Sequence, residues 1–255
     1  MSKPRFFTDS YTMFRRNLTK TLRSPESIFM AIIVPVFIMV MFGFVFGGIV
    51  DMGDISYINF IVPGIIVQCI TNASTATALG IHTDMTTGII DRFRSMAISK
   101  SAVISGHVWV SVLRSILITT VTIGAAVAIG FRPVASFTDW LLIITILILF
   151  IIAITWLVVI FGLIASDAEV ISGTGFLFTI FVFISSAFSP TETLPTVLRV
   201  FARNQPMTPV INALRSLMLG LPLDGELWVA IAWCIGITIV AFTLAVRIYK
   251  SKLTR

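Results

Sequence analysis

The sequence predicts an all-α membrane protein with six transmembrane helices, and three observations support this fold class. Of the 255 residues, 57% are hydrophobic and only 12% are charged, which is about half the charged share of a soluble domain. The mean hydropathy is +1.02. Six apolar stretches reach about the 20 residues that a spanning helix needs. This composition excludes a soluble enzyme, a disordered chain and a disulfide-stapled secreted domain.

The six predicted spans follow one another without an internal repeat or an interdomain linker. The first is too long for the core of a signal peptide and no small-residue cleavage site follows it, so we expect it to be retained. We divide the chain into a cytoplasmic interfacial helix over residues 1–27 and a single six-span domain over residues 28–255. The spans are Ile28–Val50, Tyr57–Ile81, Gly106–Phe131, Trp140–Ala165, Val170–Phe188 and Leu227–Val246.

The distribution of Lys and Arg predicts that both termini are cytoplasmic. The N-terminal tail carries six basic residues, the 82–105 loop three and the C-terminus four, whereas the opposite side carries four. The formal net charge of +6 is therefore explained by the inner membrane surface and needs no nucleic acid. We expect a multi-pass protein of the cell membrane, in a bacterial plasma membrane.

The N-terminal segment has the pattern of an amphipathic helix. Apolar residues recur at helical spacing, at Tyr11, Phe14, Leu18 and Leu22, and the basic residues lie mostly off this stripe. We expect the helix to lie in the inner interface with its apolar stripe toward lipid, and Pro25 to end it. The alternative is a basic flank that only sets the orientation of the first span.

The 82–105 loop is the longest predicted cytoplasmic connection and contains a second short amphipathic pattern. Ile89, Phe93 and Met96 fall at positions i, i+4 and i+7, with charged residues around them. An apolar knob with mixed charges suits docking into a groove on another protein. A solvated turn between two spans is the alternative.

The predicted outer loop over residues 189–226 is too long for a tight connection, and its pattern predicts two short helices. Thr193 can cap the first, with Pro195 in its first turn. The second can start at Thr208 and stop at Gly220. Each would be about 20 Å long, too short to cross a bilayer. They either form an outer or re-entrant pair on the pathway, or simply cover the bundle.

Polar side chains also lie inside the predicted spans. The second span carries Gln68, Asn72 and Thr75 at a depth where lipid offers no hydrogen-bond partners. They either join helices to one another or line a substrate or dimer surface. Arg114 lies about 12 Å into the third span. We favour a structural arginine that reaches the inner interface, with a role in coupling or substrate passage as the alternative.

Several kinds of chemistry are missing from the sequence. There is no P-loop, H-E-x-x-H or G-x-S-x-G motif, so the chain has no recognisable nucleotide or hydrolase site. His82 and His107 lack a nearby set of cysteines or acids, so we expect no metal site. Cys69 and Cys234 lie in apolar stretches and are expected to pack rather than to form a bridge. Any work driven by ATP must therefore come from a separate chain.

Two regions resemble the permease subunits of type-two ATP-binding-cassette exporters. In the outer loop these are Phe188-Ser-Pro-Thr-Glu-Thr-Leu-Pro-Thr-Val-Leu198 and Asn204-Gln-Pro-Met-Thr-Pro-Val210, and the Gln-Pro-x-Thr form is most similar to the daunorubicin-resistance permease group. In the cytoplasmic loop it is Gly88 followed by Asp91-Arg92-Phe93-Arg94. The resemblance covers almost the whole chain and implies a homodimer that works with a cytoplasmic ATPase.

The resemblance also implies roles for individual residues, without any catalytic or metal-ligating one. The turn Ser166-Asp-Ala-Glu169 matches a capping box, which explains its acids without function, yet both acids are coupling candidates as well. The coupling candidates are Asp84, Gly88, Ile89, Asp91, Arg92, Phe93, Arg94, Met96, Asp167 and Glu169. The candidates for the substrate pathway or dimer interface are Gln68, Asn72, Thr75, Arg114 and Phe188, and those for the outer helices are Pro190, Glu192, Pro195, Asn204, Pro206 and Arg215.

We therefore expect the transmembrane subunit of an exporter that moves an amphiphilic, drug-like or antibiotic substrate by alternating access. The chain itself would hold no cofactor, since ATP and Mg would bind to the partner ATPase. Its other partners would be a second copy of itself, membrane lipid and the substrate. The alternatives are a lipid or glycan exporter of the same family, a membrane-embedded enzyme, and a passive channel that conducts without an ATPase.

Overall fold

A central helix organises the bundle. The computed structural model describes residues 6–48, 55–87 and 100–252, and the regular structure in these ranges is helical, as predicted. The central helix is buried over 83% of its most apolar stretch, whereas the outermost spans are buried over only about a fifth of theirs. It is α3 (Tyr57–Thr86), and it packs against α2 (Pro25–Val45), α5 (Lys100–Ile129), α6 (Phe137–Ile164) and α7 (Ala168–Phe183).

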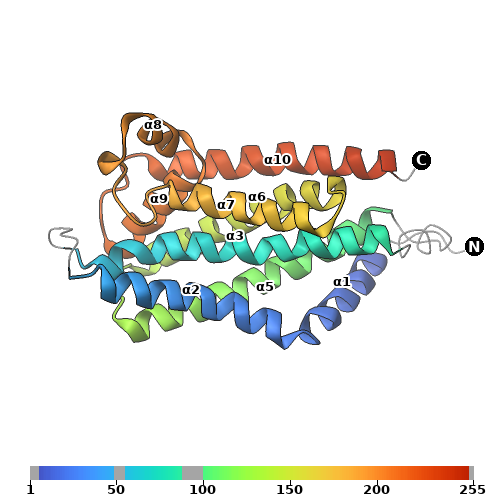
Figure 1. Ribbon diagram of the computed structural model, residues 1–255, viewed down its shortest axis with the longest axis horizontal. Helices are drawn as coiled ribbons and strands as arrows, with labels where there is room; N and C mark the ends of the chain where they lie inside the picture. Colours follow the sequence, from blue (N-terminus) through green and yellow to red (C-terminus); the bar gives the residue numbers. More distant parts are fainter. Residues whose placement is uncertain (1–5, 49–54, 88–99, 253–255) are drawn as a thin grey trace, which may run out of the picture.

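The last long helix, α10 (Glu226–Lys252), packs on α6 and on the short helix α9 (Met207–Leu219). The C-terminal end of α10 lies at the same end of the bundle as the end of α3, while α9 and the short helix α8 (Thr196–Asn204) lie at the opposite end (Figure 1). We call these the inner and the outer end.

Five helices in the described part of the chain are long and apolar enough to cross a membrane. The fifth predicted span, over 170–188, is shorter than expected, because α7 has 16 residues and ends at Phe183. Ser185 is the local reason, since its hydroxyl accepts a hydrogen bond from the backbone N–H of Ala187 and so competes with the helical pattern. The resulting turn brings Ala187 against Gly64 of α3, where an added Cβ would lie 2.6 Å from the Ala187 Cα.

Several predicted boundaries at the inner end move. Helix α2 begins at Pro25 rather than at Ile28, and α10 ends at Lys252 rather than at Val246. Helix α3 continues five residues beyond its predicted end at Ile81, and α5 begins at Lys100 rather than at Gly106. Asp84 was expected in a loop, but it lies in the last turn of α3. The predicted coupling pattern at Gly88, Ile89, Asp91, Arg92, Phe93, Arg94 and Met96 lies outside the described residues.

The outer loop contains two short helices, as predicted, with shifted starts. Thr193 was expected to cap the first helix, but it belongs to the single turn η1 (Thr191–Thr193), and Pro195 precedes α8. Helix α9 starts one residue before Thr208 and ends at Gly220. Gly220 has a φ of 65°, a left-handed conformation that glycine adopts without strain.

The N-terminal helix α1 (Phe6–Leu22) packs against the beginning of α5. The two helices cross closely, since a Cβ at Gly106 would lie 2.6 Å from the Cβ of Met13. Met13 and Asn17 are buried on this side, whereas Tyr11 and Leu22 of the predicted apolar stripe are 65% and 64% exposed. Tyr11 and Leu22 therefore face away from the bundle, whereas Phe14 and Leu18 of the same stripe are half-buried. After α1 the chain bends at Ser24 into α2, and we call this bend the α1–α2 elbow (Figure 1).

Candidate coupling site and transport surface

A buried carboxylate lies at the inner end of the bundle. Asp84 has a side chain that is only 1% exposed. Arg16 of α1 donates two hydrogen bonds to it, at 2.8 and 3.0 Å, in the forked geometry that guanidinium and carboxylate groups favour. His107 Nε2 of α5 lies 2.9 Å from Asp84 Oδ2, and Lys20 Nζ lies 3.9 Å from Oδ1. We call these four residues the Asp84 cluster.

The Asp84 cluster joins the three helices α1, α3 and α5 through charged side chains, in addition to the packing of α5 against the other two. Burial of a carboxylate costs several kcal/mol unless cations and hydrogen bonds compensate it, so the four side chains depend on one another. The hydrogen bond to Asp84 raises the pKa of Arg16, which lies in α1 outside the candidate spans, and burial acts in the opposite direction. The cluster thus holds α1 against the ends of α3 and α5, the two helices that the 88–99 segment connects.

The other inner-end candidates occupy a helix start. Asp167 is the N-cap of α7, and its carboxylate accepts a hydrogen bond of 2.9 Å from the backbone N–H of Val170. This bond holds the pKa of Asp167 below its ordinary value. The capping residue is therefore Asp167 and not Ser166, one residue later than the sequence pattern indicated. Glu169 lies in the first turn of α7, where its negative charge interacts favourably with the helix dipole.

Two of the predicted pathway residues share one face of α3, the face toward α7. Asn72 Oδ1 accepts a hydrogen bond of 3.3 Å from the hydroxyl of Thr179. One turn closer to the inner end, Thr75 lies against Gly175, where an added Cβ would come within 2.9 Å of its methyl group. Both side chains are half-buried, so this face is partly open in the single chain. We call it the α3–α7 face.

The remaining pathway candidates lie elsewhere. Gln68 is buried at 2% exposure. Arg114 points to a different side of α3, where its guanidinium donates to the Ala73 carbonyl and, at 3.2 Å, to the Thr77 hydroxyl. Phe188 lies at the outer end, with its carbonyl bonded to the Tyr57 hydroxyl and its ring 4.7 Å from that of Phe183. The five candidates therefore do not form a single site.

A buried arginine holds the outer end together. Arg215 of α9 is 8% exposed and donates to the carbonyls of Phe60 and Ser186. It also donates to Asn212 Oδ1 at 3.0 Å, and its guanidinium carbon lies 3.9 Å from the centre of the Phe60 ring. We call these contacts the Arg215 cluster. It joins α9 to α3 and to the turn after α7.

The other outer candidates lie nearer the surface. Glu192 and Arg203 form an exposed ion pair at 2.8 Å. Asn204 donates to the Val200 carbonyl in the last turn of α8. The three prolines are positioned before helical turns: Pro190 before η1, Pro195 before α8 and Pro206 before α9.

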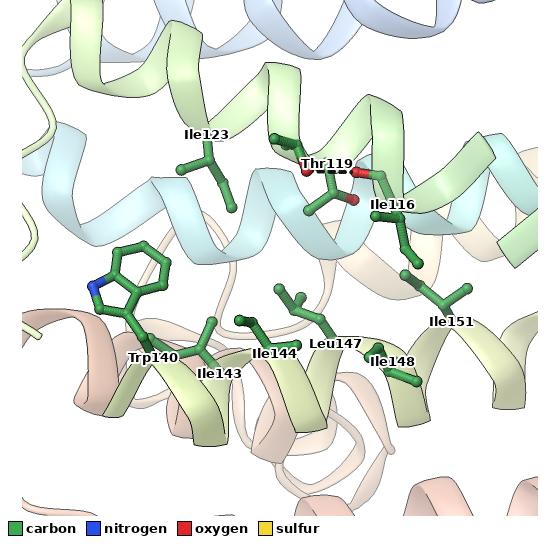
Figure 2. A pocket seen from close by; sticks show the side chains of 10 residues that line it. Ile116, Thr119, Ile123, Trp140, Ile143, Ile144, Leu147, Ile148 and Ile151 are labelled. Carbon is green, nitrogen blue, oxygen red and sulfur yellow. Dashed lines mark hydrogen bonds between the residues drawn. The ribbon is translucent and has the colours of Figure 1, made fainter. Parts of the chain in front are cut away.

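An apolar pocket of about 280 Å³ lies between α5 and α6. Figure 2 shows Trp140, Ile143, Leu147 and Ile151 of α6 facing Ile116, Thr119 and Ile123 of α5. The hydroxyl of Thr120, which also lines the pocket, donates to the Ile116 carbonyl. The pocket offers hydrocarbon contact and holds no ionisable side chain, so it has none of the groups of the Asp84 cluster.

Sequence reasoning selected Asp84 but missed its partners. Arg16 was interpreted as a basic residue that sets orientation, and His107 was considered only as a metal ligand. Nothing in the sequence pairs residues that lie 68 and 23 positions from Asp84. The one available signal was periodic: Met13, Arg16, Asn17 and Lys20 share a helical face on the side opposite the apolar stripe.

Comparison with known proteins identifies the family of the chain. The chain is 27% identical over 229 residues to a daunorubicin resistance ABC transporter permease protein of Streptomyces coeruleorubidus, covering 89% of this chain and 81% of that protein. It is 25% identical over 240 residues to a probable doxorubicin resistance ABC transporter permease protein of Mycobacterium tuberculosis, covering 92% and 86%. Residues 8–219 match the model of the ABC-2 type transporter family. This multi-pass membrane protein therefore belongs to the ABC-2 type transporter family.

Proposed function

We propose that the chain is the transmembrane subunit of an ATP-driven exporter that works as a homodimer with a separate cytoplasmic ATPase. ATP and Mg bind to that partner. Six spans, with α7 as the fifth, cross a bacterial plasma membrane, and both termini are cytoplasmic. The substrate is an amphiphilic, drug-like compound such as those named for the two relatives.

One observation carries this proposal: the Asp84 cluster links α1 to the ends of α3 and α5. An ATPase that contacts α1 and the 84–99 region acts on three helices that Asp84, Arg16 and His107 connect. Asp167 and Glu169, at the start of α7, lie within reach of the same partner. The force therefore enters the bundle at the two helices that form the α3–α7 face.

The α3–α7 face is the surface on which the second copy and the substrate meet the chain. Asn72 and Thr75 give it polar groups, and Gly175 lets α7 pack closely against Thr75 of α3. Rocking of the two copies against each other opens this face alternately to the inside and the outside. The Arg215 cluster keeps the outer helices in place while this happens.

The decisive experiment reconstitutes the chain in vesicles with the ATP-binding-cassette ATPase that co-purifies with it. We expect daunorubicin to raise the ATPase rate in wild-type vesicles. Phe93→Asp should lower the stimulated rate about tenfold, since it places a charge on the apolar knob that docks into the ATPase. The assembly should remain intact by size-exclusion chromatography.

Phe137→Asp provides the matched control. Phe137 is 81% exposed at the outer end of α6, so the same substitution there leaves the contact with the ATPase untouched. Equal stimulation in both variants and the wild type would show that the 88–99 segment does not couple the two subunits. Transport without any ATPase would support a passive channel instead.

A further inference from the structure

A cleft of about 330 Å³ lies between the α1–α2 elbow and the inner halves of α3 and α5. Its walls are hydroxyl-rich and include Ser24, Thr83 and Ser111. Lys20 lies at its solvent side with a side chain that is 55% exposed, and Arg114 lines it about 10 Å deeper along α5 than His107. Of its described lining residues, none is acidic.

The nearest carboxylate does not cancel this positive charge. Asp84 already receives two hydrogen bonds from Arg16 and one contact from His107, and its side chain is 1% exposed. Lys20 reaches Asp84 only at 3.9 Å. The guanidinium of Arg114 is bonded to neutral oxygens of Ala73 and Thr77. The cleft therefore carries a net positive potential in a region of low dielectric.

Two residues that line the cleft each carry a buried donor without a hydrogen-bond partner among the described residues, namely Asn17 Nδ2 and Arg114 Nε. Asn17 is only 5% exposed. Its amide orientation is fixed, because Asn17 Oδ1 accepts a hydrogen bond of 3.2 Å from Arg16. A buried polar group without a partner costs about 1–3 kcal/mol, and such groups in native proteins indicate a ligand or an ordered water. Both groups are donors only, so they call for an acceptor.

We propose that this cleft binds a phosphate group. The Lys20 ammonium at the mouth supplies the charge that the phosphate contacts, and the deeper Arg114 guanidinium adds to the positive potential, while Asn17 and the hydroxyls of the lining supply further donors. The same charges disfavour a cationic ligand. Leu79 lines the cleft and is 44% exposed, and Leu113, beside Arg114, is 43% exposed. Acyl chains can pack against these exposed apolar side chains. The phosphate group is therefore that of an anionic phospholipid of the inner leaflet rather than free phosphate.

This inference goes beyond the proposed export function, because the cleft lies on a different side of α3 from Asn72 and its test needs no ATPase, while it shares Lys20 and His107 with the Asp84 cluster. Its test uses the purified full chain in a neutral detergent. Phosphatidylglycerol, phosphatidylcholine, glycerol phosphate and inorganic phosphate are added separately, and binding is followed by native mass spectrometry and by the shift in melting temperature. We expect phosphatidylglycerol to bind and raise the melting temperature, and phosphatidylcholine to do neither.

Two variants locate the site. Lys20→Gln removes the charge at the mouth and should weaken phosphatidylglycerol binding about tenfold, as loss of a charge-assisted contact does. Thr83→Phe fills the cleft and should weaken binding by steric exclusion. Arg23→Gln is the matched control, since it removes the same charge from the neighbouring part of the elbow but does not line the cleft. It should change binding by less than about twofold, the effect of a screened surface charge.

The outcomes separate the two sources of phosphate. Binding of phosphatidylglycerol alone supports a lipid site, and competition by glycerol phosphate or inorganic phosphate supports a site for the free anion. Equal binding of phosphatidylglycerol and phosphatidylcholine would overturn the proposal, and so would unchanged binding in Lys20→Gln. Because Lys20 is largely exposed, its variant decides the matter even where Thr83→Phe fails to fold.

Discussion

In the described part of the chain, the inner end of the bundle holds a buried carboxylate and the outer end a buried guanidinium, and the two are compensated in different ways. At the inner end, Asp84 is compensated by the side chains of Arg16 and His107. At the outer end, Arg215 is compensated mainly by the backbone carbonyls of Phe60 and Ser186. Carbonyl groups are fixed by the helix or turn that carries them. Long side chains can release and rebind as the backbone moves.

The difference indicates which end can move. The Arg215 cluster fixes α9, α3 and the turn after α7 in one arrangement, because moving any of them would leave a buried guanidinium unpaired. The Asp84 cluster includes Arg16, which is 30% exposed, and Lys20, which is 55% exposed, so water can replace part of each contact. We infer that the outer end is the rigid part and the inner end the adaptable part.

The largest expected effect is at the rigid end. Arg215→Met keeps the aliphatic volume but leaves the Phe60 and Ser186 carbonyls without their donor. We expect a loss of about 3 kcal/mol or more in the free energy of unfolding, because several charge-assisted hydrogen bonds disappear from a buried site. Unfolding in mixed micelles, followed by circular dichroism, measures it.

Arg203→Met is the control for this change. Arg203 carries the same charge near the same end, but its side chain is 55% exposed. If Arg215→Met lost no more stability than Arg203→Met, the buried Arg215 cluster would contribute no more to the fold than the exposed ion pair of Glu192 and Arg203.

The second effect is at the adaptable end. Asp84→Asn leaves Arg16 and His107 facing a neutral amide, and we expect a loss of about 2 kcal/mol, smaller than at Arg215 because Arg16 can regain water. The main consequence should be local. Hydrogen exchange at the backbone amides of α1 should accelerate, while the amides of α9 keep their protection.

Asp9→Asn tests whether any lost charge on or near α1 gives the same result. Asp9 lies in the first turn of α1 and forms no part of the Asp84 cluster. Faster exchange in α9 than in α1 after Asp84→Asn would reverse the assignment of the rigid and adaptable ends.

The smallest effect concerns the exposed pair of Glu192 and Arg203. The hydrogen bond from Arg203 holds the pKa of Glu192 below its ordinary value of 4.5. A lowered carboxyl pKa stabilises the fold above the ordinary value, and this contribution disappears as the pH falls through the lowered one. Glu192→Gln should therefore change the melting temperature near pH 7 by no more than about 2 °C, as for other exposed pairs. If Glu192→Gln lowered the melting temperature more than Arg215→Met does, Glu192 rather than Arg215 would be the main stabilising residue of the outer end.

The sequence predicted much of the fold because the constraint from lipid is strong. A chain that is 57% hydrophobic with long apolar stretches must form helices that satisfy their own backbone groups. The short outer helices were also predictable, since proline before a helix and Gly220 after one are local signals. The length of α7 was not, because the turn that follows its end depends on contacts of Ala187 with Gly64 and of Ser186 with Arg215, which lie far away in the chain.

The candidate site was predictable only in part. Asp84 and Asn72 stood out as polar residues at an edge and in the depth of a span. The separation of Arg114 from Asn72 could not be inferred, because it depends on how the sides of α3 are shared between α5 and α7.

Composition and local patterning alone thus determined that this chain is a helical membrane protein without a recognisable nucleotide site. Only the tertiary structure decided that Arg16 and His107 surround Asp84, and that Tyr11 and Leu22 of α1 face away from the bundle. The physical reason is that insertion into lipid depends on each segment's own hydropathy. Pairing of buried charges depends on helix positions that are fixed only when the whole bundle packs.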